Sequence, residues 1–590
     1  MPEVGITRDS GGVRDGGARV RRNEWGVLAP PCPGAWRPTR TVSLVIPARD
    51  CQDLLDLSLA ALSRQTYPSG LLEVVVVDDG SEPKIELPPL APEHTRVIRA
   101  ADYSTGWGRA NALHVGAMAS DGEVLHWLDA DLLPFPEHVE AQVRWQHVSP
   151  DAVTLGHKRF VPHGPWPTPY EVESGPIEEL FPDDRAEPHG YVEEFVGATR
   201  GLREADHLVF RAHVGATAAL TRALYLEAGG LRTDLRLGED SELGYRLAQA
   251  GAVFIPEPGA RSWHLGPSHM MRDGERLRRY NQPFLADLMP HPRWLRGPAR
   301  VPGVGAGAGA AGSGAAGGGA AGAGGRSWRV PLVTAVVIVD GPFEQVRECV
   351  DRLLASDEHD LVVLLVADWA AVLPDDRRRV LDDPLLDRRL LAASYRSDPR
   401  VRLVDAAPES AFPSPYLLHM PAGLGVGPDT VRRMVGELDA HRAGLLRLVP
   451  PGDGAGPAVP VLELWRTAAV SRARRHQLPG ESVGGAVDAV WGARWATGGR
   501  FGVVDLPATG ASAAGAPSPG GPLPAVSPSG VSPAGPAPPV RPGSGGPAPA
   551  PVPVAGLRSW LRATGYVARL AAARARHRLT THHPPASIRD

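Results

Sequence analysis

Two tracts that lack core-forming side chains divide this chain and limit where folded domains can form. Residues 302–325 contain only Pro, Val, Gly, Ala and Ser, and residues 506–555 are rich in Pro, Ala, Gly and Ser. Segments of this composition bury too little apolar surface to fold, so we expect flexible linkers there. In order, the predicted parts are a disordered N-terminal tail (1–40), a first folded domain (41–300), a Gly/Ala-rich linker (301–328), a second, smaller folded domain (329–505), a disordered linker (506–555) and a basic C-terminal segment (556–590).

Composition narrows the class of protein further. The 590 residues carry a net charge of -4, which argues against general binding of nucleic acid. Three distant cysteines, Cys32, Cys51 and Cys349, predict neither a disulfide framework nor a zinc cluster, and they fit a reducing, cytoplasmic location. We expect neither a signal peptide nor a transmembrane helix, because no apolar run approaches about 18 residues. Only two of the 62 basic residues are lysines, Lys84 and Lys158, a bias that we attribute to a GC-rich genome.

The first domain opens with alternating strand and helix patterns. Residues 41–46 are apolar apart from Thr41 and Ser43 and predict a buried central strand. Residues 53–64 predict a helix that packs on the sheet, and residues 71–77 predict a second strand. A strand–helix–strand unit of this kind forms a parallel sheet with a right-handed crossover. We therefore predict an α/β domain with a mostly parallel, Rossmann-like sheet, whose ligand site lies at the carboxyl ends of the strands.

Two carboxylates follow a further predicted strand at 124–128. This apolar run ends in Asp129-Ala-Asp131, directly at the strand's carboxyl end. Carboxylates this close repel each other unless they share a cation, and a bound Mg²⁺ or Mn²⁺ would in turn hold phosphate oxygens. The pattern indicates a diphosphate site, and the alternative is an acidic pair in a solvated turn.

Downstream segments supply more candidates. Residues 161–208 are rich in prolines and acids, with little periodicity, and predict a long loop that forms a lid, an acceptor groove or a solvated connection. A helix is predicted over about 240–250, and Asp240 in its first turn would be a simple N-cap in the plainest reading. His264 offers a neutral imidazole that would complete a metal site begun by Asp131, the alternative being a structural histidine.

Four motifs of the first domain stand in a fixed order. They are Val42-Ser-Leu-Val-Ile-Pro47, Val74-Val-Val-Val-Asp-Asp-Gly-Ser81, Gly108-Arg-Ala-Asn111 and Leu128-Asp-Ala-Asp131. In this order and at these spacings they resemble the nucleotide-binding half of family 2 glycosyltransferases with the GT-A fold. The resemblance covers roughly residues 41–290. It implies an enzyme that moves a sugar from a nucleoside diphosphate to an acceptor, using a divalent ion.

The resemblance also implies a donor site. It assigns Pro47 and Ala48 to the border of the nucleoside, Asp50 to further donor contacts, Asp79 to the base, and Asp129 and Asp131 to ribose and metal. Members often carry Tyr-Asn where this chain has Arg49-Asp50, so the stacking partner of the base stays open. A fixed carboxylate such as Asp79 accepts the N–H of uracil or guanine, although Asp-Asp-Gly-Ser is also ordinary turn chemistry. Three roles are open for Arg109: contact with the diphosphate, pairing with an acid of the site, or a place on the surface.

For the chemical step the resemblance points to Glu239-Asp240, since in the family this pair lies beside the acceptor. Transfer with inversion needs a base, because an acceptor hydroxyl with a pKa well above about 10 loses its proton as the sugar is attacked. We expect Asp240 to be this base, and Glu239 to orient the acceptor hydroxyl or share the role.

The second domain repeats the order of the first. Residues 334–339, 343–355 and 361–368 again predict strand, helix and strand, and 416–420 parallels the strand that ends in Asp129. On this alignment Pro421 and Gly423 replace Asp129 and Asp131, so the copy lacks metal-binding carboxylates. We interpret 329–505 as a degenerate GT-A-like domain, the alternative being an unrelated α/β domain.

The C-terminal segment 556–590 is basic and amphipathic. Leu557, Trp560, Leu561 and Val567 lie roughly on one side of the predicted helix, among six arginines. Such a helix binds the surface of an anionic membrane, and each cation near that surface contributes about 1 kcal/mol. A peripheral position on the inner face of the plasma membrane would follow. A docking segment and a loosely ordered tail are the alternatives.

Two classes of function follow from the sequence. The first is a metal-dependent, inverting glycosyltransferase that uses a nucleoside diphosphate sugar and a glycan, lipid-linked or small-molecule acceptor. The second is a non-catalytic scaffold that recruits a partner enzyme through its second domain and basic tail. A nucleotidyltransferase is a weaker candidate, because no glycine-rich phosphate loop precedes the first helix.

Overall fold

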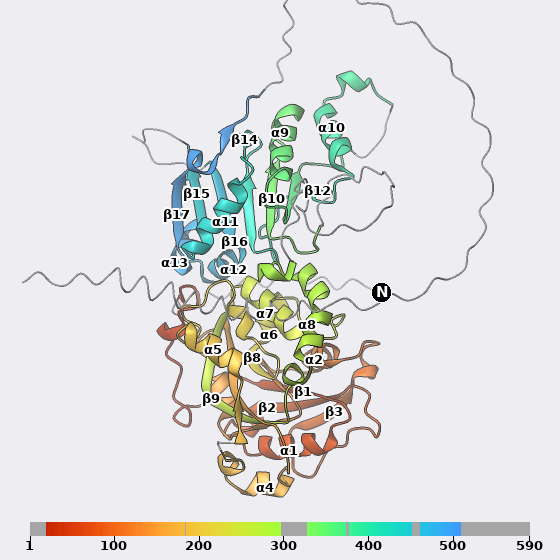
Figure 1. The fold of residues 1–590 in the computed structure, drawn as a ribbon, viewed down its shortest axis with the longest axis vertical. Helices are drawn as coiled ribbons and strands as arrows, with labels where there is room; N and C mark the ends of the chain where they lie inside the picture. The colour runs from red at the N-terminus through yellow and green to blue at the C-terminus, as the bar shows by residue number, and fades with distance from the viewer. Residues whose placement is uncertain (1–18, 183–184, 297–326, 373–376, 451–460, 509–590) are drawn as a thin grey trace, which may run out of the picture. The chain divides into compact units, whose positions relative to one another are not determined.

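The computed structural model describes residues 19–182, 185–296, 327–372, 377–450 and 461–508, which carry two large β-sheets flanked by helices (Figure 1). Most of the predicted linker at 301–328, the linker at 506–555 beyond Ala508, and the basic segment at 556–590 lie outside the described residues. None of the helices in the described ranges is both long and apolar enough to cross a bilayer.

The first sheet has nine strands in the described residues, in the order β3-β2-β1-β4-β8-β6-β9-β5, with β7 paired to β6. They are β1 (Val42–Ala48), β2 (Leu72–Asp78), β3 (Thr95–Arg99), β4 (Val124–Leu128), β5 (Leu132–Pro134), β6 (Ala152–Val161), β7 (Glu187–Pro188), β8 (Thr217–Thr221) and β9 (Val253–Leu265). Strands β3, β2, β1 and β4 are parallel, as are β6 and β9, whereas β8 runs antiparallel to β4 and β6. The predicted α/β domain with a Rossmann-like sheet is confirmed.

Helices cover both faces of the parallel strands. The helices of this domain are α1 (Gln52–Leu62), α2 (Arg109–Met118), α3 (His138–Val143), α4 (Pro169–Ser174), α5 (Gly190–Ala198), α6 (Arg222–Glu227), α7 (Glu239–Gln249) and α8 (His269–Leu288). Leu55 and Leu59 of α1 share a core cluster with Leu44 of β1, while α2 lies on the opposite face, against Val45. Because β1 is covered on both sides, its sequence is an almost unbroken apolar run instead of an alternating one.

Helix α2 approaches the sheet unusually closely at one residue. A Cβ atom added to Gly116 would lie 2.3 Å from Cγ1 of Val45 and 2.9 Å from Cγ2 of Val77. Only glycine leaves room for this contact. The close approach fixes the start of α2, which carries Arg109, near the carboxyl ends of β1, β2 and β4.

The prediction of a disordered tail over 1–40 is wrong for its second half. Arg19 and Arg22 contact the second domain, and Asn23 and Trp25 pack on the first. The Asn23 side chain is buried, and its amide donates to the carbonyls of Leu202 (3.0 Å) and Phe254 (2.9 Å). Trp25 Nε1 donates to the carbonyl of Gly201 (2.7 Å). The anchoring residues are few and are spaced among Gly, Arg and Pro, so no periodic pattern marks them.

The loop predicted over 161–208 is only partly a loop. It contains α4, which begins with a capping box between Thr168 and Glu171, and it also contains β7 and α5. Strand β9 continues past Pro256, Pro258 and Gly259 through His264 to Leu265. His264 therefore lies within a regular strand. The two prolines and the glycine inside β9 made this strand difficult to predict from the sequence.

The second sheet follows the order β12-β11-β10-β13-β16-β15-β17, and a separate pair joins β14 to β18. The strands are β10 (Val333–Ile338), β11 (Leu361–Val366), β12 (Val401–Val404), β13 (Tyr416–Met420), β14 (Leu424–Gly425), β15 (Leu445–Val449), β16 (Leu462–Arg466), β17 (Ala493–Thr497) and β18 (Val504–Asp505). The helices are α9 (Phe343–Leu354), α10 (Leu386–Tyr395), α11 (Thr430–Ala440), α12 (Thr467–His476) and α13 (Val483–Val490). A second, smaller α/β domain is thus present, as predicted.

Strand order and direction match between the two sheets. Strands β12, β11, β10 and β13 are parallel, β16 is antiparallel to both neighbours, and β15 and β17 are parallel, as in β3 to β9 of the first sheet. The register also agrees, because Val42 pairs with Val124 and Val333 pairs with Tyr416 at the first residues of the corresponding strands. Counting forward from these pairs places Pro421 at the position of Asp129.

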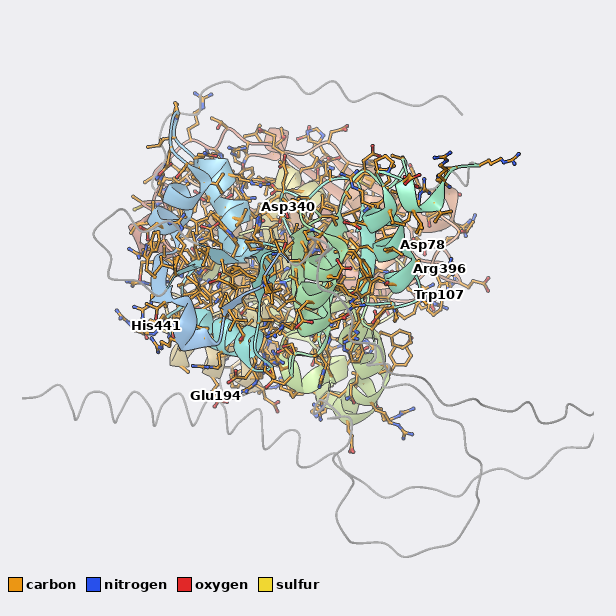
Figure 2. The ribbon with its side chains drawn as sticks, turned by 90° about the horizontal axis from the view of Figure 1, so that it is seen from above. Asp78, Trp107, Glu194, Asp340, Arg396 and His441 are labelled. Atoms are coloured by element: carbon orange, nitrogen blue, oxygen red, sulfur yellow. The ribbon has the colours of Figure 1, made fainter. Side chains whose placement is uncertain are left out.

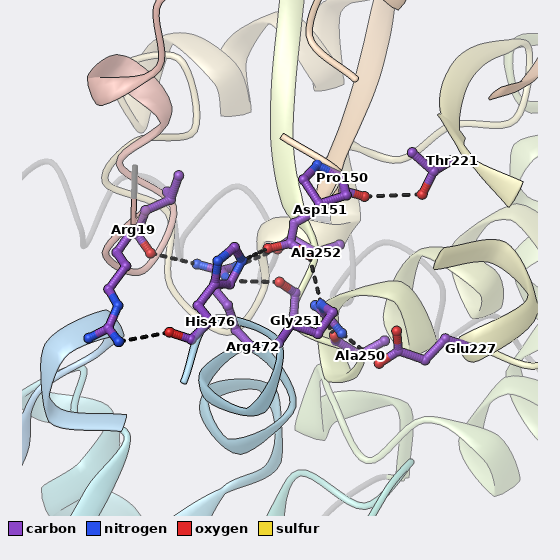
Figure 3. Close-up of polar contacts among 12 residues, drawn as sticks. Arg19, Pro150, Asp151, Thr221, Glu227, Ala250, Gly251, Ala252, Arg472 and His476 are labelled. Carbon is purple, nitrogen blue, oxygen red and sulfur yellow. Dashed lines mark hydrogen bonds and ion pairs between the residues drawn. The ribbon is translucent and has the colours of Figure 1, made fainter. Parts of the chain in front are cut away.

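The two sheet domains meet through α12 (Figure 3). The fully buried Arg472 donates to the carbonyls of Gly251 and Ala252, each at 2.7 Å. The buried carboxylate of Asp151 accepts from Arg475 Nε (2.7 Å) and contacts His476 Nε2 (2.5 Å). Burial favours the neutral acid, but these partners outweigh it and lower the pKa of Asp151 to about 2.

Candidate active site

The two aspartates after β4 meet a histidine from β9. Ligand atoms of Asp129, Asp131 and His264 all lie within 4.8 Å of one another, and Nε2 of His264 is 3.6 Å from Oδ1 of Asp131. The antiparallel pairing of β5 with β9 places His264 directly opposite Leu132, one residue after Asp131. The short turn after β4 and the pairing of β5 with β9 therefore bring together three ligands from positions up to 135 residues apart.

These residues suit a divalent cation. Oδ1 of Asp131 is buried and has no hydrogen-bond partner in the described structure, a costly state for a carboxylate unless a cation binds it. Burial and the nearby Asp129 raise the pKa of Asp131 to about 7, as expected for two acids that lack a shared positive charge. Burial lowers the pKa of His264 to about 4, so the ring is neutral near pH 7. Nδ1 of His264 lies 3.1 Å from the carbonyl of Gly266, a contact in which Nδ1–H donates and Nε2 is left to bind a metal.

Arg109, at the start of α2, connects two groups of acids. Its Nε and Nη2 donate to Oδ1 of Asp129 (3.0 and 2.7 Å), and its Nη1 donates to Oε1 of Glu239 (2.9 Å). Nη2 also donates to the carbonyl of Gly215. Of the three roles that the sequence allowed for Arg109, the structure shows the pairing with acids of the site.

Glu239 and Asp240 open α7, as the sequence predicted for this helix. Glu239 is buried, and burial together with Asp240 raises its pKa, although Arg109 opposes that shift. Oδ2 of Asp240 accepts from the backbone N–H of Gly215 (3.0 Å) and Oδ1 accepts from that of Ser241 (2.6 Å). The N-cap of α7 is Gly238, with φ of 77°, so Asp240 is not the cap. Its carboxylate is instead held against the end of the loop that leads into β8.

The carboxyl ends of β1 and β2 form a second part of the site. Pro47 and Ala48 end β1, and the Ala48 carbonyl accepts from the N–H of Asp79 (2.9 Å). Oδ2 of Asp79 accepts from the N–H of Gly108 (2.7 Å), and burial raises the pKa of Asp79. Its Oδ1 has no hydrogen bond within the described residues and remains available to a base N–H.

Two acids near Asp79 have structural partners. Asp78 is buried, and its Oδ1 accepts from the backbone N–H of Gly80 (3.1 Å) and Ser81 (2.8 Å), so it closes the turn after β2. Asp50, with φ of 50°, accepts from the N–H of Glu82 (3.0 Å). Asp50 thus ties two loops together at the rim of the site.

Two residues that sequence reasoning did not select also lie here. Trp107 precedes Gly108, is 55% exposed, and stacks under the guanidinium of Arg236 at 4.3 Å from the ring centroid (Trp107 and Asp78 are labelled in Figure 2). Lys158 of β6 is buried, and its pKa responds to Asp129, Asp131 and Asp240. The scarcity of lysine in this arginine-rich sequence is the one available signal for Lys158, and we attributed that scarcity above to a GC-rich genome.

A comparison with protein families identifies the first part of this domain. Residues 43–199 match the model described as glycosyl transferase family 2. This segment is similar to glycosyl transferase family 2. The resemblance found in the sequence is thereby confirmed over β1 to α5 of the first domain, which include Asp79, Asp129 and Asp131. Asp240 and His264 lie beyond the matched residues.

Individual proteins are similar to part of this chain. Validoxylamine A glucosyltransferase from Streptomyces hygroscopicus subsp. limoneus is 28% identical over 280 residues, which are 44% of this chain and 60% of that protein. The chain thus spans less than two thirds of this curated relative. Among solved structures, the mannosyltransferase PcManGT from Pyrobaculum calidifontis, in complex with GDP-Man and Mn²⁺, is 20% identical, with a TM-score of 0.30 over 44% of this chain and 65% of that one. GalNAc-T7 with UDP, GalNAc and Mn²⁺ is 18% identical, with a TM-score of 0.29 over 42% and 51% of the two chains.

Proposed function

We propose that this protein transfers a sugar from a nucleoside diphosphate sugar to an acceptor hydroxyl, using Mn²⁺ or Mg²⁺. The observation that carries the proposal is the convergence of Asp129, Asp131 and His264 at the end of β4, in a domain whose residues 43–199 match the family 2 model. A protein that only served as a scaffold would gain nothing from a buried, unpartnered carboxylate oxygen, which costs stability. The enzymatic interpretation therefore accounts for more of the site than the scaffold does.

The donor is proposed to lie along the carboxyl ends of β1, β2 and β4. Pro47 and Ala48 border the nucleoside, and the available Oδ1 of Asp79 accepts a base N–H. Asp129 and Asp131 would contact ribose and metal, and a bound ion would offset the charge of the diphosphate. Arg109 orients Asp129 by holding its Oδ1.

The acceptor is proposed to lie beside Glu239 and Asp240. As the new bond forms at the anomeric carbon, the acceptor hydroxyl gives its proton to Asp240, and the bond to the diphosphate oxygen breaks on the opposite face, with inversion. The backbone N–H of Gly215 holds Asp240 in place, and Arg109 links Glu239 to Asp129. One arginine thus fixes the distance between donor and acceptor ends of the site.

The second domain is proposed to be a non-catalytic copy of the first. Pro421 and Gly423 take the positions of Asp129 and Asp131, and Asp505, opposite Leu424 in β18, takes the position of His264. Pro and Gly offer no side-chain ligand, so one carboxylate alone would remain. The contact through α12 gives this copy a structural role against the first sheet.

A thermal-shift panel tests the proposed function. Nucleoside diphosphate sugars with different bases are added with and without Mn²⁺, and we expect one base series to stabilise the protein only when the ion is present. A ligand at 100 times its dissociation constant adds about 2.7 kcal/mol, enough to detect. If every nucleotide leaves the melting temperature unchanged in the presence of Mn²⁺, the transferase proposal fails and the scaffold alternative stands.

A further inference from the structure

Lys158 lies on the site face of β6, next to the metal-ligand histidine. Successive residues of a strand point to opposite faces, so Lys158 and Phe160 share one face. Phe160 is the strand partner of His264, and their ring centroids are 4.6 Å apart. The Lys158 ammonium lies 6.0 Å from the centroid of the Phe160 ring. The lysine therefore projects along the surface formed by Phe160 and His264.

The ammonium of Lys158 lies near the acids of the site but has no direct hydrogen-bond partner within the described residues. Among the described residues, no carboxylate or carbonyl accepts a hydrogen bond from its ammonium, although the side chain is buried. Burial lowers the pKa of Lys158 to about 8, and Asp129 and Asp240 oppose that effect. Those acids have other direct partners, since Arg109 holds Asp129 and the N–H of Gly215 holds Asp240. A buried cation without a paired anion is unfavourable, which points to an anionic ligand that completes it.

We propose that Lys158 binds the β-phosphate of the departing nucleoside diphosphate and stabilises the charge that develops on its leaving oxygen. This inference rests on the proposed function. Lys158 lies over Phe160, which stacks on His264, and Asp129, Asp131 and Asp240 are close enough to act on its charge. The ammonium is therefore near both the metal end and the acceptor end, between which the bond that breaks is proposed to lie. The electron pair of that bond moves onto the phosphate oxygen, and Lys158 donates an N–H to it. The acceptor's proton still goes to Asp240, so atoms and charges balance.

The test compares Lys158→Met with the wild type. Methionine keeps the length and the apolar stem but removes the ammonium. We expect the affinity for UDP or GDP with Mn²⁺, whichever the wild type binds, to fall by about 10- to 100-fold in calorimetry, the range for a lost charge-assisted hydrogen bond. Binding of Mn²⁺ alone should not weaken, because losing a nearby cation does not reduce the attraction of the acids for the ion. With an acceptor present, kcat should fall while the acceptor KM is retained. Lys84→Met, at the exposed and only other lysine, is the matched control and should equal the wild type.

Several outcomes would overturn the inference. Equal nucleotide affinity in Lys158→Met and wild type would leave no role for the ammonium at the phosphate. A rise in Mn²⁺ affinity without any loss of nucleotide affinity would make Lys158 a counter-charge of the acids instead. If Lys158→Met does not fold, Lys158→Arg keeps the charge and Lys158→Gln removes it, and the inference requires that only the arginine variant bind the nucleotide. If the wild type itself binds neither UDP nor GDP with Mn²⁺, the proposed function fails first, and the two failures are thereby distinguished.

Discussion

Asp240 is held by two backbone N–H groups and has no side-chain cation as a direct partner within the described residues. These two hydrogen bonds hold the carboxylate in place, and no cation neutralises it directly, so it can accept a proton. Arg109 neutralises Glu239 instead, so the two neighbouring acids have different surroundings. The contrast favours Asp240 as the base and Glu239 as the orienting residue.

Asp240→Asn should lower kcat by about 10²–10⁴, because the amide keeps the shape of the side chain but cannot accept the acceptor's proton. Calorimetry should show unchanged affinity for the donor nucleotide. Before an acceptor is known, slow hydrolysis of the donor by water provides the rate. A variant that hydrolyses the donor at the wild-type rate would exclude Asp240, and Glu239→Gln would then be the next substitution to measure.

Asp131→Asn should weaken Mn²⁺-dependent nucleotide binding by at least about 10-fold, since the amide cannot supply the anionic oxygen that the ion needs. Asp121→Asn, at an exposed aspartate near the start of β4, is the matched control. Isothermal calorimetry with and without Mn²⁺ gives both affinities. Unchanged affinity in Asp131→Asn would remove Asp131 from the metal site.

Much of the site could be predicted because its residues follow short, strongly apolar strands. Asp79, Asp129 and Asp131 stand immediately after β2 and β4, where a sheet gathers its polar ends. The pairing of Arg109 with Glu239 spans 130 residues, and no local pattern carries such information. Lys158 was missed for the same reason, since its surroundings come from β9, β4 and α7.

Among the elements, α2 depends on one glycine. Gly116→Ala should destabilise the first domain by about 1–3 kcal/mol, because the added Cβ meets Val45 and Val77 and the helix must shift. A drop in the melting temperature measures this effect. Gly197→Ala in α5 is a matched control, since nothing lies within 4 Å of its added Cβ, and it should be neutral or stabilising by up to about 1 kcal/mol. Equal melting temperatures for both variants would contradict the packing argument.

Elements with a strong period were predictable, and elements that depend on isolated contacts were not. The helix expected over 53–64 is α1, and that expected over 240–250 is α7, with ends that differ by one or two residues. Helices α4 and α5 were not predicted, because they lie in a proline-rich stretch without a clear period. The capping box of Thr168 and Glu171 was the available signal for α4. The packed N-terminal segment from Arg19 rests on single side chains such as Asn23.

At the scale of the molecule, Asp151 couples the two sheet domains. Asp151→Asn should lower stability at pH 7 by about 3 kcal/mol, because the cationic Arg475 loses its buried anionic partner and His476 loses the carboxylate that it contacts. The folded-state pKa of about 2 lies below the ordinary value of 3.8, so this stabilisation is present above about pH 4 and is lost as the pH falls toward 2. Melting temperatures of variant and wild type should therefore converge between pH 4 and 2. Asp234→Asn, in the exposed pair with Arg232, should cost less than about 1 kcal/mol.

Removing residues 556–590 should weaken association with anionic vesicles and leave donor hydrolysis unchanged, because the segment is basic and separate from the site residues in sequence. Co-sedimentation with vesicles at low and moderate salt measures the association. Equal sedimentation of the full chain and the shortened one at both salt concentrations would refute membrane binding by this segment.

The matching order of the two sheets has an evolutionary consequence. After a duplication, a copy that no longer turns over substrate is selected only for its fold and for its contact with the other copy. Positions such as Pro421, Gly423 and Asp505 are then free to drift, whereas the buried strand residues and Arg472 are not. Among descendants of such a duplication, the loops at the carboxyl edge of β10 to β13 should diverge faster than the strands beneath them. The corresponding loops of β1 to β4 should change most slowly of all.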